Sequence, residues 1–292
     1  MSYQKKLFPS AREDVEAAGA PRPSPQTLSP TYRLAFSDPA FLLRDELRPV
    51  RLQLELLKPE LTFQEKGIEA TIVVFGSARI LAPEAARKAL EEAEKRLGDV
   101  SGDGTAGLDV EMARRRLEQS RYYDEARRFA RIASKKGHRT ADGRFYVMTG
   151  GGPGIMEAAN RGAHEAGAES IGLNIMIPHE QAPNPYITPE LCFQFHYFAI
   201  RKMHFLMRAV ALVAFPGGFG TFDEVFETLT LIQTGKITRI PVILFGREFW
   251  EKAVDFAFLV REGMISSQDL DLFEYAETAE EACEKITRFY WG

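Results

Sequence analysis

The clearest chemical signal in this sequence is the glycine-rich segment 216–221, which reads PGGFGT. It follows the apolar run 210–215, whose length and composition predict a strand buried on both faces. A helix is predicted to start at Thr221, because apolar residues then recur with helical spacing at Phe222, Val225, Phe226, Leu229 and Ile232. A strand, a glycine turn and a helix N-terminus together present unpaired backbone N–H groups to an anion, usually phosphate. We therefore predict phosphate contacts at Gly217, Gly218, Gly220 and Thr221.

Glu224 follows Thr221 by three residues and is the candidate catalytic carboxylate. The spacing T-x-x-E is also that of a capping box, in which both side chains bond backbone N–H groups at a helix start. For an isolated pair, the capping box is the better interpretation. The three glycines immediately before this pair favour a ligand site instead. The neighbouring Asp223 and Glu227 are expected to be solvated helix residues.

Arg201 is the candidate cation of the same site. A helix is predicted at 199–208. Residues at steps of four, three and four lie on one face of it, and they are Tyr197, Arg201, His204 and Arg208. A solvated or subunit-facing polar stripe would also explain this spacing. However, a carboxylate beside a phosphate is repelled unless positive charge offsets it, and arginine is always charged and forks onto oxyanions. We expect Arg201 to lie near Glu224 and to keep it ionised, and His204 to be structural or interfacial.

Two further small-residue turns are expected beside the first. Residues 76–79 follow the predicted strand Ala70–Phe75, and residues 150–154 follow the predicted strand 144–149. The other predicted strands are 170–175, 192–196 and 240–245, with helices at 83–96, 108–136, 155–166 and 249–260. This alternation predicts an α/β fold with a doubly wound, Rossmann-like parallel sheet. Ligands bind such sheets at the carboxyl ends of the strands, so one site can use all three turns.

The chain is predicted to have three regions. Residues 1–36 are polar and proline-punctuated, which predicts a flexible or loosely packed arm. Residues 37–66 are predicted to form a helical extension that starts at Asp38-Pro39 and is interrupted near Pro49 and Pro59. Residues 67–292 are predicted to form the nucleotide-binding domain, with a surface insertion at 98–107.

Composition excludes several functional classes. The 292 residues are 45% hydrophobic and 27% charged, and the net charge of −4 gives no electrostatic case for binding nucleic acid or an anionic membrane. No apolar run approaches the ~20 residues that cross a bilayer, and the N-terminus lacks a signal-peptide core, so a cytoplasmic location is expected. Two cysteines, Cys192 and Cys283, suggest neither a disulfide framework nor a cysteine-rich metal site.

Other nucleotide and metal motifs do not fit. The segment GGGPG is not GxGxxG, and the strand that ends in Asn174-Ile175 lacks the acidic residue that would bind a ribose diol. Neither GxxxxGK[ST] nor HExxH occurs, and the five histidines show no metal-ligand spacing. The predicted site therefore suits a mononucleotide or a sugar phosphate, and no metal or organic cofactor is expected.

Four segments together resemble the LOG family of Rossmann-like phosphoribohydrolases, long mislabelled lysine decarboxylases. They are GSAR (76–79), GGGPGIMEAAN (150–160), RK (201–202) and PGGFGTFDE (216–224). The resemblance covers roughly residues 70–245, without the N-terminal extension and the insertion at 98–107. It implies hydrolysis of the N-glycosidic bond of a nucleoside 5′-monophosphate, AMP or a cytokinin nucleotide, to free base and ribose 5-phosphate. It also implies at least a homodimer, formed through the helices near 197–234.

The resemblance implies roles for individual residues. The family's catalytic arginine and glutamate correspond to Arg201 and Glu224. Glu157 is either a contact to a ribose hydroxyl or a favourable partner of its helix dipole, and Ser77 is either a substrate donor or the cap of its turn. Further substrate or phosphate contacts are expected at Gly76, Arg79, Gly151, Gly152, Gly154 and Lys202.

Two alternatives stay open. A non-catalytic carrier of the same fold, for molybdenum cofactor or a nucleotide, would use the glycine loops to hold a phosphate-bearing ligand without turnover. The presence of Arg201 together with Glu224 favours the hydrolase, in which Glu224 stabilises an oxocarbenium-like transition state and orients or deprotonates water. A lysine decarboxylase needs a lysine that carries pyridoxal phosphate, and neither Lys202 nor Lys236 lies in a supporting motif.

Overall fold

The computed structural model describes residues 8–19, 22–99, 104–135, 145–178 and 182–292. Contacts divide the chain into two compact units, Met1–Leu57 and Lys58–Gly292. The first unit contains α1 (Ala11–Ala18), η1 (Pro30–Tyr32), η2 (Ala35–Ser37), α2 (Pro39–Leu42), η3 (Asp45–Leu47) and the first turns of α3 (Arg48–Glu65). Helix α2 begins at Pro39 as predicted, because the Asp38 carboxylate accepts hydrogen bonds from the N–H groups of Ala40 and Phe41 at 3.0 and 3.3 Å.

Helix α3 runs through both Pro49 and Pro59, contrary to the prediction of interruptions there. Pro49 is the second residue of the helix, where an N–H group has no helical partner to lose. Pro59 lies in the helix interior, where a proline costs about 3 kcal/mol. Tertiary contacts offset that cost, because Pro59 and Phe63 are buried and Glu60 pairs with Arg208 at 2.5 Å.

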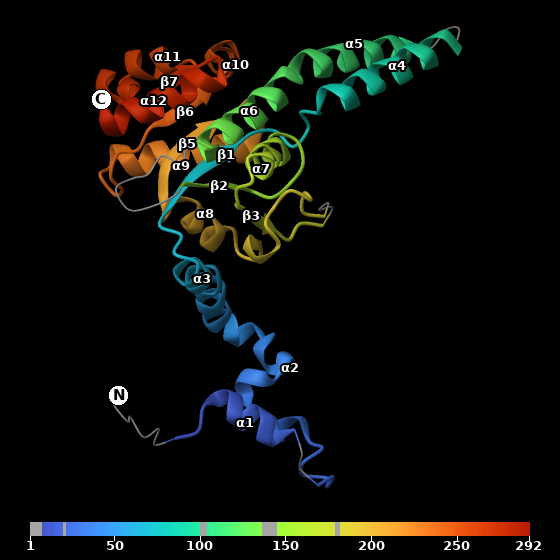
Figure 1. Cartoon of the computed structure of the whole chain (residues 1–292), viewed down its shortest axis with the longest axis vertical. Coiled ribbons are helices and arrows are strands. Elements are labelled where there is room, and N and C mark those ends of the chain that lie inside the picture. Colours follow the sequence, from blue (N-terminus) through green and yellow to red (C-terminus); the bar gives the residue numbers. More distant parts are fainter. Residues whose placement is uncertain (1–7, 20–21, 100–103, 136–144, 179–181) are drawn as a thin grey trace. The chain divides into compact units, whose positions relative to one another are not determined.

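The second unit is built on a seven-stranded parallel sheet in the order β4-β3-β2-β1-β5-β6-β7 (Figure 1). The strands are β1 (Ala70–Phe75), β2 (Phe145–Thr149), β3 (Ser170–Ile175), β4 (Cys192–Phe195), β5 (Ala209–Ala214), β6 (Val242–Phe245) and β7 (Glu274–Ala276). From β1 the chain adds strands on one side as far as β4, and from β5 it adds them on the other side. The predicted doubly wound parallel sheet is therefore confirmed, with its switch point between β1 and β5.

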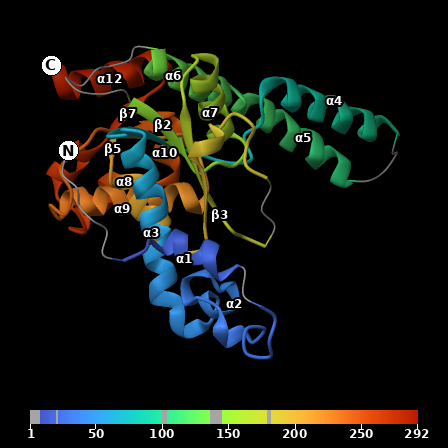
Figure 2. The ribbon, with the colours of Figure 1, turned by 60° about the horizontal axis from the view of Figure 1, so that its bottom comes forward.

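Helices cover both faces of this sheet. Alternate side chains of β1 enter two separate cores, Ile72 and Val74 in one and Val73 and Phe75 in the other. The first core is closed by α6 (Arg121–Lys135), α7 (Ile155–Glu165) and α12 (Ala279–Trp291). The second is closed by α8 (Phe198–Leu206), α9 (Phe219–Gln233) and α10 (Arg247–Ala253), on the opposite side of the sheet (Figure 2). Because both faces are buried, the strands read as continuous apolar runs.

Two predicted helices are each divided in the structure. The predicted helix 108–136 is α5 (Gly104–Gln119) followed by α6, with Ser120 between them donating its hydroxyl to Leu117 O at 2.6 Å. The predicted helix 249–260 is α10 followed by α11 (Phe256–Arg261), whose first turn Asp255 caps by accepting from Phe258 N–H at 2.8 Å. Short polar side chains that bond nearby backbone compete with a continuous helical ladder, which explains both breaks.

The predicted insertion at 98–107 lies partly outside the described residues. Its described part belongs to the end of α4 (Pro83–Asp99) and the start of α5. These two helices pack on each other through a small apolar cluster of Ala93, Val110 and Ala113. Helices α4 and α5 therefore form a pair that packs through its own small core.

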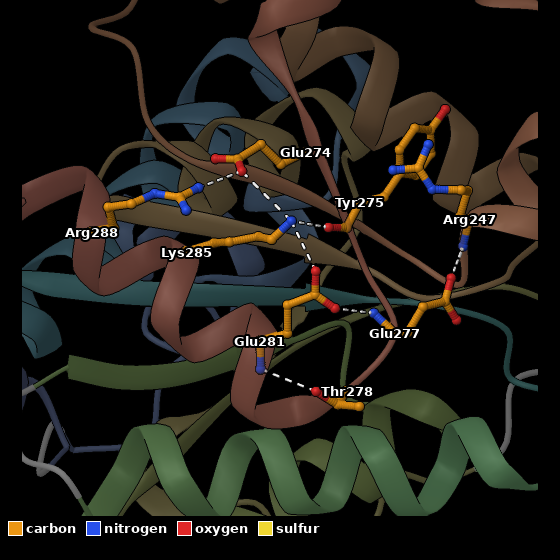
Figure 3. A network of polar contacts seen from close by, with 8 residues as sticks. All are labelled: Arg247, Glu274, Tyr275, Glu277, Thr278, Glu281, Lys285 and Arg288. Carbon is orange, nitrogen blue, oxygen red and sulfur yellow. Dashed lines mark hydrogen bonds and ion pairs between the residues drawn. The ribbon is translucent and has the colours of Figure 1, made fainter.

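Strand β7 was not predicted from the sequence. It has three residues at the edge of the sheet, and side chains of α12 hold it there (Figure 3). Lys285 Nζ donates to Tyr275 O at 2.6 Å, and Arg288 lies 2.7 Å from the Glu274 carboxylate. The turn that follows is fixed by Glu277, which accepts from Arg247 N–H at 2.7 Å. Contacts between segments, rather than a local apolar pattern, therefore stabilise this strand.

Candidate active site

The loops after β1, β2 and β5 are joined by backbone hydrogen bonds at the carboxyl ends of their strands. Ser77 N–H donates to Pro216 O at 3.0 Å, and Ile155 N–H donates to Ser77 O at 3.2 Å. The loop 76–79 is therefore bonded to both of its neighbours, beside the switch point of the sheet. The structure thus brings together the three turns that the sequence analysis assigned to one site.

Several glycines of these loops allow one segment to pack closely on another. A Cβ on Gly154, whose φ is 71°, would lie 2.4 Å from Ser77 O. A Cβ on Gly76 would lie 2.6 Å from Cγ2 of Ile155, and one on Gly217 would lie 2.1 Å from Oγ1 of Thr221. These three glycines, predicted as ligand contacts, are required by the packing of the loops themselves.

The start of helix α9 differs from the prediction. The helix begins at Phe219 with Gly218 as its N-cap, two residues before Thr221. Thr221 and Glu224 do not form a capping box, because the N-cap is a glycine without a side chain and Thr221 N–H donates to its carbonyl at 3.0 Å. A Cβ on Gly218 or Gly220 would meet open space. In the described part of the chain the N–H groups of Phe219 and Gly220 have no acceptor, so this turn can receive an anion.

Glu224 lies in the second turn of α9 and is buried, with 8% of its surface exposed. No described residue donates a hydrogen bond to its carboxylate. Burial raises the pKa of this carboxyl to about 7, although the positive charges of Lys202 and Arg201 act in the opposite direction. A carboxyl with this pKa is part protonated and part ionised at neutral pH, which suits a group that takes up and returns a proton.

Lys202 lies between two carboxylates next to Glu224. Its Nζ is 2.9 Å from Oδ2 of Asp223 and 3.0 Å from Oε2 of Glu227. Burial lowers the pKa of Lys202, whereas its hydrogen bonds to these two carboxylates raise it. The combined upward effects are larger, so the pKa lies above its usual value. Asp223 and Glu227, expected from the sequence to be solvated, therefore hold a cation beside the candidate catalytic carboxyl.

Arg201 is fixed near the carboxyl ends of β2 and β3. Its Nε donates to Leu173 O at 2.8 Å, and its guanidinium carbon lies 5.1 Å from the centre of the Phe205 ring. A Cβ on Gly150 would lie 2.6 Å from Nη2 of Arg201, so the guanidinium packs directly on the glycine loop after β2. Its charge lowers the pKa of Glu224. The two side chains predicted to act together thus share one electrostatic environment.

The polar stripe that contains Arg201 is partly buried, and His204 is buried almost completely. His204 is 1% exposed, and its ring centre lies 5.6 Å from that of Phe195 and 6.3 Å from that of Phe63. Arg208 pairs with Glu60 and donates from Nε to Ile68 O at 2.9 Å. The stripe therefore packs α8 and the residues after it against the rest of the unit, and His204 has the structural surroundings that were expected.

Three other predicted contacts have structural surroundings of their own. Ser77 Oγ accepts the N–H of Arg79 at 3.1 Å, so Ser77 caps its turn, while the Arg79 side chain is exposed. Glu157, in the first turn of α7, accepts a hydrogen bond from Tyr123 Oη at 2.7 Å. Direct contacts of Ser77, Arg79 and Glu157 with a substrate stay predictions.

The sequence analysis missed a buried polar network beneath the glycine loop after β2. Asn184 Nδ2 donates to the carbonyl oxygens of Gly151 and Gly152, both at 3.1 Å, and to Oδ1 of Asn160 at 2.9 Å. Thr149 Oγ1 donates to the same Asn160 oxygen at 2.7 Å and accepts from Gly151 N–H at 3.0 Å. The sequence did contain one indication of this network, because Asn160 is a polar residue on the apolar face of its helix.

Among the residues that the structure describes, no group of three or more His, Cys, Asp or Glu side chains is placed to hold a metal ion. Cys192 and Cys283 are not joined in a disulfide. Nor does any described helix combine the length and hydropathy that crossing a bilayer demands.

Comparisons with known proteins agree with the motifs of this site. A family model described as possible lysine decarboxylase matches residues 156–286. The cytokinin riboside 5′-monophosphate phosphoribohydrolase LOG3 of Arabidopsis thaliana is 28% identical over 148 residues, which are 49% of this chain and 66% of that protein. The enzyme LOG of Oryza sativa subsp. japonica is 29% identical over 147 residues, which are 49% of this chain and 59% of that protein. These matches support assignment of the chain to the LOG family.

These matches span less than two thirds of the length of the two LOG-family relatives. Solved structures that resemble the chain include the molybdenum cofactor carrier protein of Chlamydomonas reinhardtii, with a TM-score of 0.45 and 18% identity over 77% of this chain and 99% of that one. The molybdenum cofactor binding protein of Rippkaea orientalis has a TM-score of 0.42 and 17% identity over 76% of this chain and 98% of that one.

Proposed function

We propose that this LOG-family protein hydrolyses the N-glycosidic bond of a purine nucleoside 5′-monophosphate, AMP or a cytokinin nucleotide, to free base and ribose 5-phosphate. The observation that carries the proposal is the buried Glu224 carboxyl. Its pKa is raised to about 7, it lies near the start of α9 beside the open backbone of Gly218 and Gly220, and it interacts with two cations. The names of the curated relatives, which are phosphoribohydrolases, support the same chemistry.

The 5′-phosphate is proposed to bind between the N-termini of α9 and α7. Within the described residues, the N–H groups of Phe219 and Gly220 on one side and of Gly152 and Gly154 on the other have no acceptor. Each helix N-terminus also carries a positive partial charge, which stabilises an anion by about 0.3–1 kcal/mol at an exposed site. The two loops are bonded through Ser77, so one phosphate can contact both.

Ionised Glu224 is proposed to accept a proton from the water whose oxygen attacks C1′ of the ribose. The C1′–N9 bond breaks, its electron pair leaves with the base, and positive charge develops on the ribose in an oxocarbenium-like transition state. A buried carboxylate stabilises this charge strongly because little water screens the interaction. The departing base takes up a proton, which a carboxyl with a pKa of about 7 is able to return.

Arg201 is proposed to bind the phosphate or the departing base, and Lys202 is proposed to supply a second positive charge next to the substrate. Both cations are held before substrate arrives, Arg201 by Leu173 O and Lys202 by two carboxylates. Because their side chains are already ordered, little conformational entropy is lost when an anion binds.

The test is the release of free base from AMP and from N6-isopentenyl-AMP, measured by chromatography. Glu224→Gln and Arg201→Ala are each expected to lower the rate about 100-fold or more, the usual cost of removing a group that stabilises a transition state, without a lower unfolding midpoint. The exposed residues Glu262 and Arg131 provide matched controls, and Glu262→Gln and Arg131→Ala are expected to keep the wild-type rate.

Near-wild-type turnover in both Glu224→Gln and Arg201→Ala would refute the assignment of the site. A wild-type protein that is inert toward every nucleoside monophosphate, yet binds a phosphate-bearing pterin, would favour the carrier alternative instead.

A homo-oligomer, at least a dimer, is proposed to form through α8 and α9. Phe198 and Met203 in α8 are 54% and 49% exposed, and Phe219 at the start of α9 is 95% exposed. Exposed large apolar side chains are typical of surfaces that bind another protein. Light scattering is expected to give at least twice the mass of one chain, and Met203→Lys is expected to lower it. The cytoplasmic location expected from the sequence stays a prediction.

A further inference from the structure

We propose that Asn184 is a positioning residue, which sets the direction in which the glycine loop after β2 presents the Gly152 N–H to the substrate phosphate. This inference rests on the proposed function. Asn184 lies between β3 and β4 and is 33 residues away from Gly151, with which it bonds. No motif of the family resemblance contains it.

Asn184 bonds the carbonyl side of the loop from both its backbone and its side chain. Its N–H donates to Gly151 O at 2.9 Å, and its Nδ2 donates to Gly151 O and Gly152 O, both at 3.1 Å. The residue is 6% exposed, and Nδ2 also donates to Asn160 Oδ1 at 2.9 Å. Its Oδ1 accepts Tyr186 N–H at 3.2 Å. Both polar atoms of the side chain therefore have partners, and only one orientation of the amide satisfies them.

Because the peptide group is planar, the bonds to Gly151 O also determine the direction in which Gly152 N–H points. In a trans peptide the C=O of one residue and the N–H of the next point in opposite directions, and the described chain has no cis peptide. Because Gly151 O points to the buried Asn184 side chain, Gly152 N–H points away from it. The carbonyl of Gly152 is followed by Pro153, which has no N–H to orient. The N–H of Gly151 is already bonded to Thr149 Oγ1 at 3.0 Å.

A second asparagine packs closely on Gly151 and leaves no room for a side chain there. Gly151 has a φ of 78°, and a Cβ there would lie 2.3 Å from Oδ1 of Asn174. Asn174 is fixed in turn, since its Nδ2 donates to Phe193 O at 3.1 Å. The peptide between Gly151 and Gly152 cannot turn over without breaking the bonds to Asn184. Two of the three bonds to the loop carbonyls come from the Asn184 side chain, which therefore holds the donor in place, together with the Asn184 N–H, before the phosphate arrives.

A residue that only anchored its own segment would not orient the loop. Thr188 is such a residue, and it lies in the same connection between β3 and β4. Its Oγ1 accepts Ser170 N–H at 3.0 Å and its N–H donates to Ser170 O at 3.2 Å, without a contact to the loop carbonyls. Thr188→Ala is therefore the matched control for Asn184→Ala.

The experiment measures ribose 5-phosphate binding by calorimetry together with the kinetics of base release from AMP. Asn184→Ala is expected to weaken ribose 5-phosphate binding and to raise KM for AMP, each about tenfold or more, as for a lost hydrogen bond to a charged group. Its kcat at saturation is expected to stay within about threefold of wild type. Thr188→Ala is expected to keep wild-type affinity. Glu224→Gln is expected to keep the affinity and to lose kcat.

The outcomes separate this inference from the proposed function. Unchanged affinity and KM in Asn184→Ala, or an equal loss in Thr188→Ala, would overturn the role of Asn184 alone. Failure of the wild-type protein itself to bind ribose 5-phosphate would overturn the proposed function, and this inference with it.

A measurement on the wild-type chain replaces the variant if Asn184→Ala does not fold. On titration with ribose 5-phosphate, the amide NMR signal of Gly152 is expected to shift strongly, and that of Gly151, bonded to Thr149, is expected to shift little. A larger shift for Gly151 than for Gly152 would contradict the orientation assigned to the loop.

Discussion

At the scale of single residues, burial and charge act in opposite directions on the Glu224 carboxyl. The sequence analysis expected an adjacent cation to keep this group ionised. In the structure two cations, Lys202 and Arg201, do lower its pKa, but burial raises it more, and the result is about 7. Removal of a carboxylate from water is the larger effect because no described hydrogen-bond donor replaces that water. A carboxyl with this pKa is part protonated at neutral pH and not permanently charged, as the proposed proton transfer requires.

The rate of base release is therefore expected to depend on pH. The ratio kcat/KM should rise with pH and level off above an apparent pKa near 7, since the ionised form of Glu224 accepts the proton. Lys202→Met removes a positive charge beside Glu224 and is expected to move this midpoint to higher pH. Initial rates from about pH 5 to pH 9 check both points. A flat profile over this range would contradict a catalytic role for Glu224.

The same titration is expected to affect stability. The pKa of Glu224 is raised from 4.5 to about 7 in the folded protein, so the folded state binds a proton that the unfolded chain releases. The protonated carboxyl therefore makes its full contribution to the free energy of unfolding below pH 4.5. This contribution is lost as the pH rises through about 7. Glu224→Gln does not titrate, so between about pH 4.5 and 8 its free energy of unfolding should rise relative to wild type by on the order of 3 kcal/mol. Urea unfolding at several pH values measures this, and a constant difference would argue against the shift.

At the scale of elements, the glycines of the candidate site fall into two groups: those required by the packing of one loop on another, and those with open space beside them. Gly217 has Thr221 side-chain atoms within 3 Å of its missing Cβ, whereas Gly218 has nothing within 4 Å. Both residues belong to the same glycine pair before α9. The two glycines look equivalent in the sequence motif, but only Gly217 is required by close packing, whereas Gly218 has open space beside it.

Substitution of these two glycines is expected to separate stability from binding. Gly217→Ala should lower the free energy of unfolding by about 1–3 kcal/mol, because its Cβ overlaps the Thr221 side chain and cannot be accommodated without movement of the helix start. Gly218→Ala, with a φ of −97° and open space beside it, should stay within about 0.5 kcal/mol of wild type but weaken ribose 5-phosphate binding. Urea unfolding and calorimetry distinguish the two effects. Equal destabilisation by both substitutions would contradict this account.

At the scale of the whole molecule, every residue assigned to the candidate site belongs to the unit Lys58–Gly292. That unit contains the complete parallel sheet and both apolar cores that cover its faces. The described residues of the unit Met1–Leu57 form helices of their own. The division into an arm, a helical extension and a catalytic domain stays a prediction.

A chain that begins at Arg48, and so retains all of helix α3, is expected to fold and to keep base release within about threefold of the full chain. The reason is that it preserves Phe63 in the core and the ion pair between Glu60 and Arg208. Thermal unfolding and AMP hydrolysis compare the two chains. A truncated chain that folds but loses activity would show that the N-terminal unit contributes to the site.

The local sequence pattern was sufficient to predict strands β1 to β6 and the parallel class of the sheet. Buried parallel strands are continuous apolar runs, and here most of them end at glycine or proline, so the signal lies within a few consecutive residues. Strand β7 has three residues and is stabilised by Lys285 and Arg288 from a helix further along the chain. The breaks at Ser120 and Asp255 were missed because side-chain bonds to nearby backbone outweigh apolar periodicity there.

The sequence by itself determined the residue types of the candidate site, Arg201 and Glu224 with the glycine turns, and their place at the carboxyl ends of parallel strands. Only the tertiary structure decided the pKa of Glu224, the pairing of Lys202 with two acids and the bonds of Asn184 to the glycine loop. The physical reason is that a motif records neighbours along the chain, whereas desolvation, ion pairing and loop orientation depend on segments that folding brings together from distant positions.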